Sequence, residues 1–214
     1  MEARTELQEE SLVGVLSDDA QAAFDDAMAE MSVRSYRTAV RTVFAAMEAL
    51  VWHMKDLMLK VCDKYPDSYS SLELAALRDE AYFVANNGVV KSKSNFIPVS
   101  TSLRLIEHLI KRIETIRYEP SLSRKALALL ESSVVVRNRL THPKAATDFA
   151  VTKTDVEDAI LSYASVQGFA VQVLSEAEAH LALHAGEAVE SIRARTVPLH
   201  PQTRNVQEAV ERRR

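Results

Sequence analysis

Apolar residues recur every three or four positions along most of this chain, which is the spacing of amphipathic α-helices. The longest such run covers residues 32–64, where a wide apolar stripe predicts one long helix. Ser32 is placed to cap its start, and the Tyr-Pro step at residues 65–66 ends it. A separate amphipathic stretch precedes it over residues 12–31, with a break expected near Ser17.

Shorter periodic segments follow the long one. They predict helices over residues 70–85, 102–117 and 121–140 and a final core helix from Thr154, with a loop over residues 89–98. The Asn-Asn-Gly triplet after the first of these is typical of a helix C-terminus, and Thr-Asp-Val-Glu at the start of the last has the form of a capping box. Beyond about Ala185 the periodicity fades, and the prolines that follow predict a tail.

The composition agrees with a helical protein, because 4 glycines and 6 prolines in 214 residues leave few tight turns. We therefore expect an all-α fold, a helical bundle of about five or six helices with a long first core helix. Three parts are expected: an acidic N-terminal helical extension (1–31), the bundle (32–182) and a partly irregular C-terminal tail (183–214). Trp52 and Cys62 are predicted to lie in the core.

Several kinds of protein are disfavoured by the same composition. A single cysteine excludes an intramolecular disulfide and fits a reducing compartment, and no Cys/His cluster has metal-binding spacing. No apolar run approaches the roughly 20 residues that a membrane span needs, and the acidic N-terminus does not resemble a signal peptide. We expect a cytoplasmic protein with no membrane partner, no metal and no cofactor.

The formal charge of −4 is unevenly distributed. Residues 1–30 hold nine acidic side chains against one basic, which leaves residues 31–214 at +4. A mildly basic body is compatible with a polyanionic partner, although a charge run is more often a solvated helix face. One hypothesis is that the acidic segment folds across a basic groove and restrains activity by imitating RNA.

The sequence Arg-Asn-Arg-Leu-Thr-His-Pro at residues 137–143 carries the strongest chemical signal. Arg137 keeps its charge at any physiological pH and can hold a phosphate, whereas His142 can move a proton near neutrality. These two groups suffice for RNA cleavage through the ribose 2′-hydroxyl without a metal. Asn138 lies one helical turn before His142 and is placed to hydrogen-bond or orient the imidazole.

Context separates this pair from a chance match, because the same spacing recurs at Arg195 and His200 in a stretch without apolar periodicity. The first pair follows a run of three valines that is expected to lie at least partly in the bundle, and Pro143 ends the helix at His142. On an ideal helix Arg137 points about 140° away from His142. Convergence therefore needs the long arginine side chain, a distorted last turn or a second subunit.

The motif resembles that of the HEPN domain family, whose signature is Arg-x4–6-His, often Arg-Asn-x3-His, at a helix end and commonly before proline. The resemblance extends to Phe-Ala-Ala-Met-Glu-Ala-Leu at residues 44–50, which is similar to the family's first helix with its internal acid. It also includes Phe-Ile-Pro at residues 96–98 and the helix after the motif, and it covers roughly residues 32–180.

This resemblance implies a metal-independent endoribonuclease that leaves a 2′,3′-cyclic phosphate and acts as a toxin or an antiviral-defence effector. It implies a homodimer with both motifs in one composite site, in which Arg137 and His142 are catalytic and Asn138 is auxiliary. The implied partners are RNA, with tRNA and mRNA as candidates, and an antitoxin or a defence-system protein.

Neighbouring residues complete the predicted site. Arg139 and Lys144 are candidates for RNA binding, and Glu48 for a carboxylate that orients Arg137 or His142. His53 and a basic stripe of Arg34, Arg37 and Arg41 are weaker candidates, since each is also explained by a solvated helix face.

Two alternatives remain open at this stage. In the first, the chain is a non-catalytic HEPN module that dimerises or binds RNA or protein. In the second, it is an unrelated helical scaffold in which Arg137 forms a structural ion pair.

Overall fold

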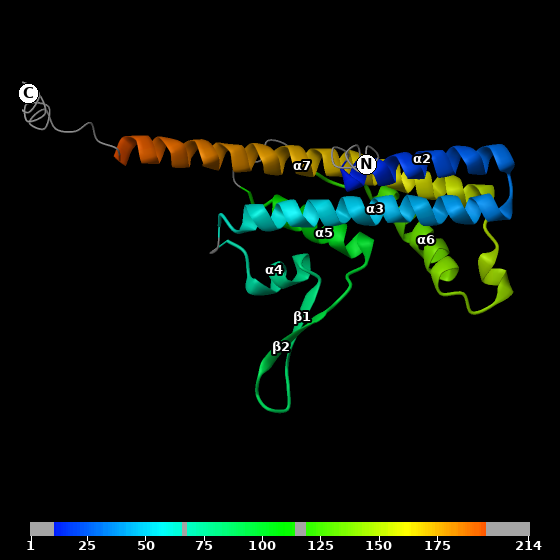
Figure 1. Cartoon of the computed structure of the whole chain (residues 1–214), viewed down its shortest axis with the longest axis horizontal. Helices are drawn as coiled ribbons and strands as arrows, with labels where there is room; N and C mark the ends of the chain where they lie inside the picture. The colour runs from blue at the N-terminus through cyan, green and yellow to red at the C-terminus, as the bar shows by residue number, and fades with distance from the viewer. Residues whose placement is uncertain (1–10, 66–67, 114–118, 196–214) are drawn as a thin grey trace, which may run out of the picture. The chain divides into compact units, whose positions relative to one another are not determined.

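The computed structural model describes residues 11–65, 68–113 and 119–195, with the backbone alone for 187–195. In chain order the described elements are α2 (Leu12–Glu30), α3 (Val33–Cys62), α4 (Ser71–Leu77), β1 (Glu80–Val84), β2 (Val90–Ser94), α5 (Val99–Ile110), α6 (Arg124–Thr141), the 3-10 helix η1 (Ala146–Phe149) and α7 (Lys153–Arg195) (Figure 1). The predicted all-α helical bundle is thereby confirmed, with one small two-stranded sheet added. The chain divides after Ala177, within α7, into two compact units, and the larger one holds all the other elements.

Helix α3 is the centre of the larger unit, because α2, α4, α5 and α6 all pack against it (Figure 1). Its cap is reciprocal: the Ser32 hydroxyl accepts the Ser35 N–H at 3.1 Å, and the Ser35 hydroxyl accepts the Ser32 N–H at 3.3 Å. Its apolar stripe is buried along the whole helix, from Tyr36 to Cys62. The long first core helix follows from this pattern, since burial of one wide face stabilises it.

Helix α2 is continuous, so the break expected near Ser17 is wrong. The Ser17 hydroxyl lies 2.7 Å from the Val13 carbonyl and 2.6 Å from the Tyr163 hydroxyl of α7. Both contacts satisfy the serine inside a helix, which removes its tendency to start a new one. Met31 ends α2 in the left-handed region at φ 50°, with its N–H bonded to the Ala27 carbonyl.

The expected helix over 70–85 and the loop over 89–98 are also corrected. Helix α4 stops at Leu77, and β1 and β2 form an antiparallel hairpin in which Tyr82 lies opposite Ser92 and Phe83 opposite Lys91. The Asn-Asn-Gly triplet is its turn, where Gly88 has a φ of 79° that other residues rarely adopt. Such triplets serve helix ends and hairpin turns alike, and the Tyr-Phe-Val run before it favours a strand.

A partly buried ion pair joins the base of this hairpin to α3. Lys55 is buried in α3, and its Nζ lies 2.6 Å from Oδ1 of Asp79, which also accepts the Ile97 N–H at 3.3 Å. The Asp79 carbonyl accepts the Asn95 N–H at 2.7 Å, and its φ of 53° turns the chain into β1. One aspartate therefore fixes the segment that leads from β2 to α5.

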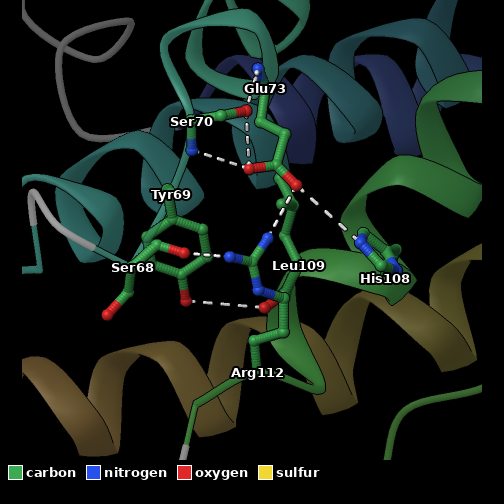
Figure 2. Close-up of polar contacts among 7 residues, drawn as sticks. All are labelled: Ser68, Tyr69, Ser70, Glu73, His108, Leu109 and Arg112. Atoms are coloured by element: carbon green, nitrogen blue, oxygen red, sulfur yellow. Dashed lines mark hydrogen bonds and ion pairs between the residues drawn. The ribbon is translucent and has the colours of Figure 1, made fainter.

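The short helix α4 is held to the end of α5 by a polar cluster shown in Figure 2. Ser70 and Glu73 form a capping box, and the Glu73 carboxylate also pairs with Arg112 at 2.6 Å. Arg112 donates to the Ser68 carbonyl and lies 4.9 Å over the Tyr69 ring, while the Tyr69 hydroxyl donates to Leu109 at 3.5 Å. The Ser70 backbone N–H, followed by the other contacts, lowers the pKa of Glu73.

Helix α7 begins at Lys153 rather than Thr154. The capping box is Thr152 with Asp155, whose carboxylate accepts the Thr152 N–H at 2.8 Å, so the predicted Thr154–Glu157 box is wrong by two residues. The backbone remains helical to Arg195, past the point where apolar periodicity fades.

Of the two residues predicted to lie in the core, Cys62 is buried. The prediction for Trp52 is wrong, because 61% of its surface is exposed. Trp52 lies on the solvent side of α3, on a face that no described helix covers. In the described part of the chain no helix combines the length and the apolar character that crossing a bilayer requires.

Candidate functional site

A groove of about 650 Å³ lies where the end of α6 meets the middle of α3 and the start of α5. All six site residues predicted from the sequence line it, together with five apolar side chains and Asp148. The full lining is Phe44, Glu48, Phe96, Pro98, Val99, Val134, Arg137, Asn138, Arg139, His142, Lys144 and Asp148. The motif and the internal acid of α3 are therefore brought to one concave surface.

Arg137 is positioned by two side chains. Its Nη2 forms an ion pair with Oε1 of Glu48, and its Nη1 donates to the Asn138 amide oxygen at 3.3 Å. The Arg137 side chain is 23% exposed and that of Glu48 34%, so the pair forms part of the groove wall. Glu48 thus contacts Arg137 and not His142 in this arrangement, and it balances part of the guanidinium charge.

His142 follows the last residue of α6 and is exposed in the groove. Its φ of −126° and ψ of 61° lie outside the helical region, as the following proline predicts, and its backbone N–H donates to the Asn138 carbonyl at 2.9 Å. Within the described residues no side chain hydrogen-bonds its imidazole. The Asn138 amide, which was expected to orient the ring, is instead directed to Arg137.

The two side chains predicted to bind RNA, Arg139 and Lys144, differ in whether an ion pair holds them. Arg139 Nη2 lies 3.4 Å from Asp155, the residue that caps α7, so this side chain links α6 to α7. Its buried Nε has no hydrogen-bond partner among the described residues. Lys144 is exposed, and no ion pair holds its ammonium group in the described part of the chain.

Asp148 also lines the groove, although the sequence did not predict it as a site residue. Its carboxylate accepts the backbone N–H groups of Lys144 at 2.7 Å and Ala145 at 2.9 Å, which cap η1. These two bonds, Lys144 first, lower the pKa of Asp148, so it is ionised at neutral pH. An acid three residues after a turn residue is a recognisable capping signal, but its place in the groove depends on the fold.

With His142 neutral, the groove lining has three cations and two carboxylates and therefore one net positive charge. Protonation of His142 adds a second. A surface of this sign attracts an anion without holding it irreversibly.

The weaker candidates lie elsewhere or have structural contacts. Arg41 donates to the Leu140 carbonyl at 2.9 Å, where a cation stabilises the C-terminus of α6, and Arg37 lies 5.4 Å over the Phe149 ring. Arg34 lines a separate hollow beside α2, and exposed His53 is not part of the groove wall. Of the Arg195/His200 pair, His200 lies outside the described residues, as does the acidic stretch 1–10.

Among the described residues no three His, Cys, Asp or Glu side chains are grouped so that they could hold a metal ion. Comparisons with models of protein families, with curated proteins and with solved structures found no match.

Proposed function

We propose that this chain is an endoribonuclease of the HEPN type that needs no metal, acting as a toxin or antiviral-defence effector in the cytoplasm. The observation that carries the proposal is the convergence of Arg137, Asn138, His142 and Lys144 on one groove with a net positive charge. A cation that can hold a phosphate and an imidazole that can take up and give a proton are the minimum that 2′-hydroxyl attack requires.

In the proposed reaction, neutral His142 takes the proton of the ribose 2′-hydroxyl while the oxygen attacks the adjacent phosphorus. The bond from phosphorus to the 5′-oxygen breaks, and a protonated imidazole gives its proton to that leaving oxygen. The products are a 2′,3′-cyclic phosphate and a 5′-hydroxyl. Arg137 stabilises the charge that builds up on the phosphoryl oxygens in the transition state.

This mechanism needs an acid and a base, but the described groove contains one histidine. A second copy of the chain supplies the other imidazole, which is why the proposal includes a homodimer with a composite site. Glu48 is a positioning residue in this scheme, since it holds Arg137 against the wall of the groove.

A second candidate is a non-catalytic module that dimerises or binds a partner. It is favoured by the ion pairs of the two arginines in the groove, Arg137 with Glu48 and Arg139 with Asp155. Arginines engaged in this way contribute to packing between helices whether or not a phosphate is ever bound.

The deciding experiment incubates the purified protein with total RNA and with tRNA in excess EDTA at pH 6–8. His142→Ala and Arg137→Ala are compared with the matched control His53→Ala, which removes an exposed histidine outside the groove. We expect EDTA-resistant cleavage that yields cyclic phosphate ends, lost in the first two variants and retained in the control. If the folded wild-type protein leaves RNA intact under every condition, the proposed nuclease activity is rejected and the binding module is favoured.

A further inference from the structure

A second, smaller hollow of about 170 Å³ adjoins the groove along α3. It shares Glu48, Phe96 and Val99 with the groove, so the two spaces have common walls. Its outer walls include two aromatic side chains that are largely open to solvent, Trp52 at 61% and Phe96 at 68% exposure.

Large aromatic side chains usually bury most of their surface within the protein, unless they contact a ligand or a partner. Trp52 comes from α3, and Phe96 from the segment between β2 and α5 that Asp79 fixes through Asn95 and Ile97. The segment that carries Phe96 is therefore anchored to α3 by the Lys55–Asp79 pair.

The charged side chains of the groove and those of the hollow favour different ligands. In the hollow each charged side chain is paired, Lys55 with Asp79 and Glu48 with Arg137. The groove carries the net positive charge and the exposed Lys144. A phosphate is accordingly favoured in the groove, whereas an uncharged planar ring is favoured in the hollow.

We propose that the hollow between Trp52 and Phe96 binds one base of single-stranded RNA, next to the nucleotide whose phosphate occupies the groove. This inference rests on the proposed function and adds the substrate class. Its volume is below the range of pockets that enclose whole small-molecule ligands, but it suits a single ring system. Stacking on aromatic faces requires an unpaired base, because bases in a duplex already stack on one another.

The hairpin that precedes Phe96 carries further cations. Lys91 and Lys93 of β2 are exposed on the hairpin face that carries Phe83, and this face has no acidic side chain in the strand pairs that form it. The hairpin projects from the helices in Figure 1, and its two lysines offer positive charge to the phosphates of a longer RNA.

The rival occupant is a second copy of this chain covering both aromatic residues. The shared walls and the division of charge favour the base, because a protein surface does not require a cationic groove beside a neutral hollow.

The test uses full-length protein carrying His142→Ala, which leaves RNA uncleaved. Trp52 is the chain's one tryptophan, so fluorescence excited at a wavelength that tyrosine does not absorb reports on this side chain alone. We expect saturable quenching by single-stranded oligoribonucleotides of about 8–12 nucleotides. Polyphosphate, which offers a backbone without bases, and an RNA duplex of the same sequence should leave the fluorescence unchanged.

A second measurement follows binding by the anisotropy of a labelled oligoribonucleotide. Phe96→Ala and Trp52→Leu should each weaken binding roughly tenfold, while Trp52→Phe retains most of it. Leu72→Ala, which truncates an exposed apolar side chain of α4, is the matched control and should bind as the parent does.

The outcomes separate this inference from the proposed function. RNA binding by anisotropy without quenching, and without loss in Phe96→Ala, overturns the base site and leaves the nuclease standing. Fluorescence that changes with protein concentration alone, and not with RNA, assigns the hollow to a subunit interface and also overturns it. Failure of the wild type to bind or cleave any RNA removes the proposed function itself.

Discussion

Lys55 illustrates at the scale of one residue how a charge is tolerated in the core. Its ammonium group is almost fully buried, and Asp79 compensates it while also accepting the Ile97 N–H. Burying a charge is unfavourable, so removing one partner is costlier than removing both.

We therefore expect Asp79→Ala to lower the free energy of unfolding by about 3 kcal/mol. The double variant Lys55→Met/Asp79→Ala should recover at least half of that loss, because it leaves no unpaired buried charge. Urea unfolding followed by circular dichroism measures both. Additive losses in the double variant would show that the two side chains are energetically independent.

Cys62 is the one thiol of the chain and lies in the core at the end of α3. Burial, and next the nearby Asp63 carboxylate, raise the pKa of the thiol to about 12. Only the thiolate reacts with disulfide reagents, and at pH 8 this group is protonated.

The native protein should thus react with a disulfide reagent such as dithionitrobenzoate far more slowly than the unfolded protein at pH 8. In 6 M guanidinium one equivalent of thiol should appear within minutes. Absorbance of the released thiolate is the readout. Equally fast reaction in both states would mean that the thiol is accessible in the fold.

At the scale of elements, α4 shows how a helix of seven residues persists. It is too short to be stable alone, and the Ser70–Glu73 capping box with Arg112 ties it to the end of α5. Because these contacts lower the pKa of Glu73 relative to the unfolded chain, their stabilisation is present above the unfolded pKa and is lost as the pH falls through the folded pKa.

Glu73→Gln keeps a capping side chain but loses the charge that pairs with Arg112. We expect it to lower the free energy of unfolding by about 1 kcal/mol at pH 7, and this difference should shrink as the pH falls through the lowered pKa of Glu73 in the folded protein. Asp56→Asn, which breaks an exposed pair with Lys60, is the control and should change little. A Glu73→Gln effect that stays constant from pH 7 to pH 3 would rule out the charge contribution.

The elements also show where sequence patterns are sufficient and where they are ambiguous. The end of α6 at Thr141 was predictable, because the His-Pro step disfavours helix irrespective of the surroundings. The hairpin was not, since Asn-Asn-Gly fits both a helix end and a turn, and the choice depends on the pairing of β1 with β2. Helix α2 likewise runs through Ser17 because Tyr163, distant in sequence, accepts or donates at its hydroxyl.

For the whole molecule, the central question is whether two chains share one site. If each cleavage uses the imidazole of His142 from both subunits, a mixed dimer with one His142→Ala chain lacks either the acid or the base. After subunit exchange, an equal mixture of wild type and His142→Ala should retain about a quarter of the activity of undiluted wild type, the fraction of dimers with two intact copies.

Mixing with His53→Ala instead should preserve full activity, and sedimentation should show a dimer in every case. Retention of half the activity in the His142→Ala mixture would indicate that each subunit cleaves independently, and the composite site would then be abandoned.

The sequence by itself determined the long helices, the helix end at His142 and the gathering of chemically capable residues near it. These properties depend on neighbours three or four positions apart or on the covalent restriction of a proline. Only the tertiary structure decided that Glu48 pairs with Arg137, that Asp148 enters the groove and that Trp52 remains exposed. Each of these depends on which distant segment covers a given surface, and a pattern along the chain does not contain that information.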